Sequence, residues 1–451
     1  MLVKREFRVE KEYHYNRSDP VKWIASHLMR YPALPIIALA AAIINNYATA
    51  YIQIIIGRTF DLISEPGWEI SALALLALGV VIAALVQGIL GLVRNYATEF
   101  IAQRMERDSR DELYISLLGK DQTFHGRQRI GDVMARATND VRQLNYMFSP
   151  GVMLIMDSAI GTVIPIILIA TIDLRLLIVP LLFLILFAIT LYSYNEQLNP
   201  VSEAQREEFG KMNAGLAETV SGIGVVKGNA QEPQEEEKFD GDARSFRNYY
   251  VKQGEIQARY LPLLIFSVAL AAAFLLALFM WRAGELTLGQ VVTYMGLIGL
   301  LRFPTFISLF SFNLVQLGIA SARRILEMIN TETDLDENEA GQGASIGGEV
   351  VFDHISFGYN GSAVLKDISF TAKPGETVAI VGQTGSGKTT LTRLINRIFD
   401  VNSGRVLVDG ADVRDWNLES LRSQISTIEQ DVFLFSRTIA ENIAFGCPDA
   451  S

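Results

Sequence analysis

The sequence is poor in the side chains that build disulfides and common metal centres. Cys447 is the only cysteine among 451 residues, so no disulfide forms within the chain and no cysteine-based metal site exists. The four histidines show no paired spacing, which argues against a zinc site. Positive charge is also scarce, since 39 Lys and Arg residues face 49 Asp and Glu residues, for a net charge of −10. This balance argues against a nucleic-acid partner.

Apolar residues, in contrast, are abundant. Hydrophobic residues make up 50% of the chain and the mean hydropathy is +0.26, both high for a soluble protein. The N-terminus is charged through residue 22, and the first apolar stretch after it exceeds about twenty residues. This pattern predicts a retained membrane span rather than a cleaved signal peptide. The length leaves room for about two or three domains.

Residues 382–390 match the pattern of a phosphate-binding loop, or P-loop. Its glycines let backbone N–H groups turn toward nucleotide phosphates, Lys388 reaches the β- and γ-phosphates, and the Thr389 hydroxyl ligates Mg²⁺. The β-branched run 376–382 predicts a buried parallel strand before the loop. Apolar residues at helical spacing predict a helix after it, namely Leu391, Leu394, Ile395 and Ile398. This order aims a helix N-terminus at phosphate, so we expect an ATP site with Mg²⁺. The expected nucleotide-binding residues of the loop are Gly382, Gln383, Thr384, Gly385, Ser386, Gly387, Lys388, Thr389 and Thr390.

Six apolar segments are long enough to cross a bilayer of about 30 Å. They lie near residues 32–56, 72–93, 150–171, 175–193, 260–281 and 288–312. The last is the weakest, because it contains Gln290, Thr293, Arg302 and Pro304. The segments 1–31, 94–149 and 194–259 carry 7, 9 and 8 Lys or Arg residues. The three short loops between spans carry one each, namely Arg58, Arg175 and Arg282. This asymmetry predicts a cytoplasmic N-terminus and, after an even number of spans, a cytoplasmic P-loop.

A helix is expected at residues 20–30, ahead of the first span. Asp19 is its predicted N-cap, Pro20 its first residue, and Trp23 is expected to face lipid headgroups. Two other tryptophans fall at predicted outer ends of spans, Trp68 and Trp281. The long cytoplasmic segments have few helix breakers, so the membrane helices are expected to continue into the cytoplasm. Gly-bearing interruptions at 118–126 and 221–224 predict a short transverse helix at each tip.

The polar residues inside the predicted spans can be functional or can be ordinary structural features. Asp157 and Arg302 could pair with each other or contact a polar part of the cargo, and snorkelling or a water-filled cavity would accommodate either alone. In the first span, five polar or aromatic residues form a candidate cargo pathway, against ordinary hydrogen bonding between helices. They are Asn45, Asn46, Tyr47, Tyr51 and Gln53.

An acidic, Gly-containing linker at 330–347 separates this region from a pattern of short strands and turns that begins at Gly348. The predicted fold is an all-α polytopic membrane domain of six transmembrane helices with long cytoplasmic extensions, followed by an incomplete α/β P-loop nucleotide-binding domain. The predicted boundaries are 1–31 for a cytoplasmic segment with an elbow helix, 32–329 for the transmembrane domain, 330–347 for the linker and 348–451 for the nucleotide-binding part.

From about residue 20 to the end, the chain resembles an exporter-type half-transporter of the ABC transporter superfamily. The motifs that carry the resemblance are Phe357-Gly-Tyr359, Gln430 within 426–435, the stretch 438–446, and the intracellular-loop motifs 131–140 and 218–227. The resemblance implies that Tyr359 stacks on adenine and that Gln430 senses Mg²⁺ and the γ-phosphate. It also implies a dimer with a second half-transporter, identical or different, that sandwiches two ATP molecules and exports a lipid, drug or peptide through the plasma membrane.

The chain departs from the family pattern after the P-loop half of the domain. The family's Leu-Ser-Gly-Gly-Gln signature, its second Mg²⁺-binding Asp with the following catalytic Glu, and its switch His have no counterpart in these 451 residues. Asp409 follows an apolar pair, but it lies too soon after the P-loop and matches the family's Asp-Gly turn instead. No catalytic residue is therefore assigned within the chain. A C-terminally truncated piece with very slow phosphoryl transfer is expected.

Three other classes compete with the exporter. A nucleotide-gated membrane protein without active transport, such as a channel or its regulator, is the main alternative. A membrane-anchored P-loop kinase fits poorly, because an anchor needs only one span. An importer is disfavoured, because importers of this superfamily usually keep permease and ATPase on separate chains.

Overall fold

The computed structural model describes residues 4–9, 12–259, 261–359 and 361–447. Its contacts divide the chain into two compact units. The helical unit consists of Tyr31–Gln103 and Tyr146–Leu317. The mixed unit consists of Met1–Arg30, Arg104–Asn145 and Gly318–Ser451, and it contains the β-sheet. The expected fold class, helical spans followed by a small sheet-containing domain, is confirmed.

Within the described residues, six helical stretches are long and apolar enough to cross a membrane, as the sequence predicts. They run over Ala33–Ser64, Ile70–Leu118, Ile130–Ile172, Leu174–Ser221, Leu264–Arg282 and Leu288–Asn330. The main helices in them are α2 (Ala33–Ser64), α3 (Ile70–Leu118), α7 (Met153–Ile172), α8 (Ile178–Ser221), α11 (Leu261–Arg282), α12 (Leu288–Leu300) and α13 (Arg302–Asn330). Because α2 continues to Ser64, Arg58 lies on a helix and not in the expected loop. Trp68 and Trp281 are 42% and 46% exposed, as side chains at a membrane interface would be.

Helices α2 and α12 pack closely against each other in the helical unit. A Cβ atom at Gly57 would collide with the carbonyl of Gly289, so only glycine permits the helices to approach this closely. Asp61 accepts hydrogen bonds from the backbone N–H of Gly289 at 2.7 Å and from the Thr287 hydroxyl at 2.8 Å. Small residues and polar side chains at a helix interface are typical of membrane bundles, where no hydrophobic driving force joins the helices.

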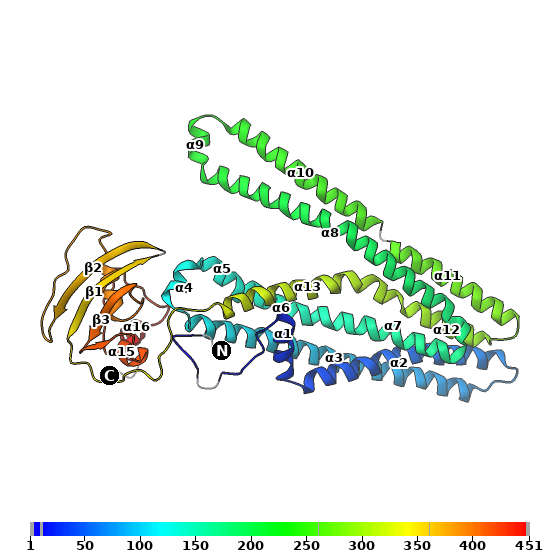
Figure 1. Ribbon diagram of the computed structural model, residues 1–451. Helices are drawn as coiled ribbons and strands as arrows, with labels where there is room; N and C mark the ends of the chain where they lie inside the picture. The colour runs from blue at the N-terminus through cyan, green and yellow to red at the C-terminus, as the bar shows by residue number, and fades with distance from the viewer. Residues whose placement is uncertain (1–3, 10–11, 260, 360, 448–451) are drawn as a thin grey trace. The chain divides into compact units, whose positions relative to one another are not determined.

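The predicted transverse helices are both present. In the mixed unit, α4 (Gln122–Arg127) follows the end of α3, with the Asp121 side chain accepting from the Phe124 N–H. It leads into α5 (Ile130–Ala135) and α6 (Val141–Tyr146), joined by the π-helical turn Arg136–Asp140; a second π-helical turn, Met147–Val152, precedes α7. In the helical unit, α9 (Ile223–Gly228) forms the tip of the hairpin in which α8 and α10 (Glu232–Ala258) lie side by side (Figure 1).

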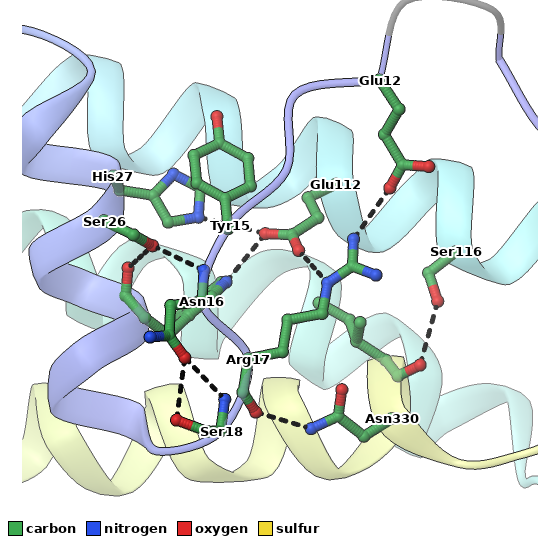
Figure 2. A network of polar contacts seen from close by, with 12 residues as sticks. Glu12, Tyr15, Asn16, Arg17, Ser18, Ser26, His27, Glu112, Ser116 and Asn330 are labelled. Carbon is green, nitrogen blue, oxygen red and sulfur yellow. Dashed lines mark hydrogen bonds and ion pairs between the residues drawn. The ribbon is translucent and has the colours of Figure 1, made fainter. Parts of the chain in front are cut away.

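The helix α1 (Pro20–Met29) begins as predicted, with Asp19 accepting from the Val21 N–H at 2.8 Å. The expectation that Trp23 faces lipid headgroups is wrong, because Trp23 is fully buried and its Nε1 donates to Glu112 Oε2 at 2.8 Å. Figure 2 shows the network around this carboxylate, which also accepts from Arg17 Nε at 2.6 Å and lies 3.0 Å from Nε2 of His27. A buried indole is well placed when its N–H finds such a partner.

Among the described residues, the sheet of the mixed unit has four antiparallel strands in the order β2-β1-β3-β4. The strands are β1 (Val350–Tyr359), β2 (Ser362–Ala372), β3 (Ser403–Val408) and β4 (Ala411–Asp412). Helix α14 (Lys388–Ile395) lies between β2 and β3 in the sequence, and α15 (Leu418–Ser423) and α16 (Ile439–Ile443) come after β4. Leu391 and Leu394 of α14 are buried in the core beneath the sheet, as their spacing predicts. Ile398 lies beyond the end of α14, so the helix is shorter than the sequence pattern predicts.

The strand predicted at 376–382 is not formed among the described residues. A strand is defined by the backbone ladder it shares with a neighbour, and no described segment supplies one here. The apolar side chains of this run are consequently open, and Val381 is 88% exposed.

Candidate functional site

The glycine-rich loop between residue 382 and α14 adopts a backbone that only glycine takes without strain. Gly385 and Gly387 have φ angles of 85° and 91°, in the left-handed region that favours glycine. Gly387 is the N-cap of α14, and a Cβ atom there would come within 2.7 Å of Leu365 Cδ2. The loop is therefore folded so that the N-terminus of α14 opens directly onto it.

Lys388, the first residue of α14, bends back over the loop. Its Nζ donates to the carbonyl oxygens of Gly382 at 2.9 Å and Gln383 at 2.8 Å. The N–H of Ser386 also donates to Gln383, at 3.2 Å, which closes the turn. One ammonium group and the free N–H groups of a helix N-terminus thus face the same loop. Such an arrangement binds anions such as phosphate.

Tyr359 is the last residue of β1 and lies next to α14. Its hydroxyl is 3.3 Å from the hydroxyl of Thr390, which is 8% exposed. The rings of Phe357 and Phe399 stand edge-on to it, with centroids 5.0 and 5.4 Å away. These contacts fix the ring while 38% of the residue stays exposed. An anchored, partly open aromatic ring can accept a stacked base.

Gln430 comes from the segment after α15, and its side chain is exposed. The neighbouring Glu429 forms an ion pair with Arg393 of α14, at 3.5 Å between Oε2 and Nη2. This pair brings the segment beside the helix that begins at the loop. Tyr359 thus lies beside the first turn of α14 and the segment of Gln430 beside its last turn, although Tyr359 and Gln430 are 71 positions apart in the sequence (430 − 359).

The loop suits Mg²⁺ only as a partner of a phosphate ligand. Within the described residues, no group of three or more His, Cys, Asp or Glu side chains is arranged to hold a metal ion. Mg²⁺ usually binds through one or two protein ligands together with substrate phosphates and water. The exposed hydroxyl of Thr389 and the amide of Gln430 are donors of that kind.

Asp409 has a structural role, in agreement with its rejection as a catalytic residue. It accepts backbone N–H groups from Glu349 at 2.9 Å, Gly348 at 3.0 Å and Gly347 at 2.5 Å. These hydrogen bonds lower the pKa of the Asp409 carboxyl. The residue sits with φ of 50° beside Gly410, in the turn between β3 and β4. Its charge ties the start of β1 to this turn.

A cavity of about 510 Å³ lies in the mixed unit beside Tyr359, and no sequence pattern predicts it. One wall is formed by α4 with Gln122, Thr123, Gly126 and Arg127, and the other by residues 357–359, 361 and 399–402. The sequence predicts α4 as a transverse helix, but it contains no signal for what that helix contacts. Arg127, which lines this cavity beside Tyr359, is therefore a polar group that sequence reasoning missed.

Two comparisons with known proteins match this arrangement. Residues 36–305 match the family described as ABC transporter transmembrane region, and residues 365–450 match the family described as ABC transporter. Among the curated relatives, the ATP-dependent lipid A-core flippase of Syntrophus aciditrophicus is 30% identical over 83% of this chain and 63% of its own length. The fatty acid ABC transporter ATP-binding/permease protein of Mycobacterium bovis is 34% identical, over 73% of this chain and 52% of its own.

A third relative is the uncharacterized ABC transporter ATP-binding protein YknU of Bacillus subtilis, which is 26% identical over 92% of this chain and 72% of its own length. The chain spans less than two thirds of the length of the first two relatives. The transmembrane match alone covers more than half of the chain, and the loop at α14 falls inside the second match. The chain belongs to the ABC transporter family of multi-pass membrane proteins, whose transport is coupled to ATP, and within it to the exporter-type half-transporters.

Proposed function

We propose that the protein is an ATP-driven exporter that moves a lipid, drug or peptide across a membrane as one half of a dimer. The observation that carries the proposal is the presence, in one chain, of six candidate spans and of a glycine-rich loop with Lys388 folded over it. The relatives support the substrate range, since one is named for lipid A-core and another for fatty acids.

In this proposal the backbone of residues 382–387 and the ammonium of Lys388 hold the triphosphate, and Tyr359 stacks on adenine. Thr389 and Gln430 hold Mg²⁺ together with the phosphates. Thr390 is proposed to bind the nucleotide as part of the loop, and its hydroxyl, 3.3 Å from that of Tyr359, also holds the ring in place. Bound Mg-ATP supplies binding free energy for closure of the dimer. Mg-ATP can drive transport only if it binds the closed dimer more tightly than the open one.

We infer that residues 32–329 form the transmembrane domain and that 348–451 belong to the nucleotide-binding domain, joined by the linker 330–347. The one-sided distribution of Lys and Arg supports a cytoplasmic N-terminus and nucleotide-binding domain in a plasma membrane. The partner in the dimer is a second half-transporter.

The test is transport by the complete protein in proteoliposomes. Fluorescent phospholipid and dye substrates are expected to cross the bilayer when Mg-ATP is added, and Lys388→Ala is expected to abolish this flux because the phosphates lose their cation. Lys366→Ala, which removes an exposed lysine of β2, is the matched control and is expected to keep the wild-type rate. Wild-type flux in Lys388→Ala would overturn the proposal.

The same vesicles separate the exporter from a nucleotide-gated channel. An exporter accumulates its substrate against a gradient, whereas a channel raises ion conductance when nucleotide is added and builds no gradient. Conductance without ATP-dependent accumulation of any tested amphiphile would favour the channel.

A further inference from the structure

The first described residues of the chain, Lys4–Val9, form an extended strap that lies against the junction between α3 and α4. The N–H of Glu6 donates to the carbonyl of Gly119 at 2.9 Å. A Cβ atom at Gly119 would come within 2.8 Å of the Phe7 carbonyl, so the strap approaches this junction as closely as glycine allows. The contact is made by backbone atoms and holds the strap at the base of the transverse helix α4.

The strap also binds the segment that follows α13. The Lys4 carbonyl accepts from the Thr333 hydroxyl at 2.9 Å, and the Arg5 carbonyl accepts from the Glu337 N–H at 2.8 Å. Thr333 is 6% exposed, so this contact is largely shielded from water. Loss of these hydrogen bonds would leave buried polar groups unsatisfied, which costs stability.

Buried charges fix the strap to the chain that follows it. The Arg5 side chain is only 5% exposed and its Nη1 lies 3.0 Å from Glu12 Oε2. Arg17 contacts the other oxygen of Glu12 at 2.8 Å. Burial alone would raise the pKa of Glu12, but the two guanidinium groups outweigh it and lower that pKa. Arg5 therefore anchors the strap to the segment that follows it.

One side chain connects the strap to the helix that begins at the glycine-rich loop. Arg422 of α15 contacts both carboxylate oxygens of Glu6, at 2.9 and 3.3 Å. The same guanidinium donates to the carbonyl of Asn396 at 3.1 Å and of Arg397 at 2.8 Å, at the C-terminus of α14. A cation at this position is favoured by the helix dipole and by the free carbonyls. Glu6 thus holds a guanidinium that caps the P-loop helix at its far end.

We propose that the strap is a clamp whose docking through Glu6 is linked to nucleotide binding at the N-terminus of α14, so that each stabilises the other. The inference rests on the proposed nucleotide site. A bound triphosphate fixes α14, which orders the Asn396 and Arg397 carbonyls that hold Arg422, and Arg422 in turn holds Glu6. Since the coupling is a free energy between two sites, it is reciprocal. Loss of the strap therefore weakens nucleotide binding, and nucleotide slows the release of the strap.

The test is hydrogen exchange of the peptide that contains residues 4–9, followed by mass spectrometry on the 451-residue chain with and without Mg-ATP. In the wild type, Mg-ATP is expected to slow exchange at least about five-fold, the lower end of ordinary coupling. Glu6→Gln keeps the shape of the side chain and removes its charge. It is expected to exchange faster, to lose the response to Mg-ATP, and to bind a fluorescent ATP analogue at least about five-fold more weakly.

Two further variants distinguish a failure of the clamp proposal from a failure of the proposed nucleotide site. Glu339→Gln is the matched control, because Glu339 is an exposed partner of Arg8 at 3.8 Å, and it is expected to behave as wild type. Deletion of residues 1–9 is expected to reduce nucleotide affinity at least as much as Glu6→Gln. Nucleotide binding that depends on Lys388 but leaves exchange in the strap unchanged would overturn the clamp and keep the proposed function. Absence of any Lys388-dependent binding would overturn both.

Discussion

Asp157 of α7 and Arg94 of α3 form an ion pair in the helical unit, with 2.6 Å between Oδ2 and Nη1. Their side chains are 12% and 15% exposed. The pairing of Asp157 with Arg302 that the sequence left open is therefore wrong, and Arg302 is exposed at the start of α13. Depth along a helix is readable from residue counting, but the helix that faces a given side chain is not.

The ion pair predicts how single and double substitutions behave. Asp157→Asn is expected to destabilise the protein by about 1–3 kcal/mol, because it leaves the guanidinium of Arg94 without its ionised partner and with little water around it. Thermal unfolding in detergent measures this. The exchange Asp157→Arg with Arg94→Asp is expected to recover much of the stability that Asp157→Arg alone loses. Equal recovery by Arg302→Asp would contradict the pairing, and Arg302→Gln is expected to have little effect.

The anchored ring of Tyr359 predicts a base-specific loss of affinity. Tyr359→Ala is expected to weaken ATP binding about ten-fold or more, since stacking of a base on an aromatic ring is worth about 1–3 kcal/mol. Tyr359→Phe keeps the ring and loses only the contact with Thr390, so it is expected to bind nearly as well. Competition by inorganic tripolyphosphate against a fluorescent ATP analogue is expected to stay unchanged in both. A matching loss of tripolyphosphate binding in Tyr359→Ala would show that the ring acts on the loop and not on the base.

The 451-residue chain is expected to bind ATP and to release phosphate no faster than buffer. Two carboxylates of the nucleotide-binding part are engaged elsewhere, as Glu429 pairs with Arg393 and Asp409 accepts three backbone N–H groups. A general base must be free to orient water, and neither meets this condition. Phosphate release is the measurement. A clear turnover that disappears in Lys388→Ala would contradict the prediction.

Lys120 predicts a pH dependence of stability in the mixed unit. Its Nζ donates to the carbonyls of Ile329 and Thr331, and burial, together with the charges of Arg5 and Arg17, lowers its pKa from 10.5 to about 8. Below about pH 8 both the folded and unfolded states carry the proton, and burying the charge costs stability in full. Between about pH 8 and 10.5 the unfolded state binds more protons, so stability rises with pH.

The measurement is the melting temperature of wild type and Lys120→Met at several pH values between 7 and about 10.5. The difference between the two proteins is expected to shift in favour of wild type as the pH rises through this window. A difference that stays constant would show that the Lys120 proton is bound equally in both states. The substitution removes the ammonium group and keeps an unbranched apolar stem, so packing around the stem changes little.

Polar residues of the first span form hydrogen bonds with backbone groups of their own helix and of neighbouring helices. Asn45 donates to the backbone carbonyl of Gln87 at 2.5 Å, and Asn46 donates to the backbone carbonyl of Ala42 at 2.9 Å. At Gln53 the contact is made by the backbone carbonyl, which accepts from the Thr293 hydroxyl at 3.4 Å. These contacts favour hydrogen bonding within and between helices over a cargo pathway. The sequence left both interpretations open, because a polar face has the same pattern whether it meets a ligand or a neighbouring helix.

Local chemistry explains which parts of this protein can be predicted from sequence alone. Spans such as 32–56, the N-cap Asp19, the short helix within 118–126 and the turns at Gly385 and Gly387 each follow from a few neighbouring residues, through hydrophobic length, capping and backbone sterics. The tertiary structure alone decided the rest. Trp23 is buried on Glu112, Asp157 meets Arg94, and Glu6 reaches Arg422, because each partner lies dozens to hundreds of residues away and pairing depends on how the helices pack.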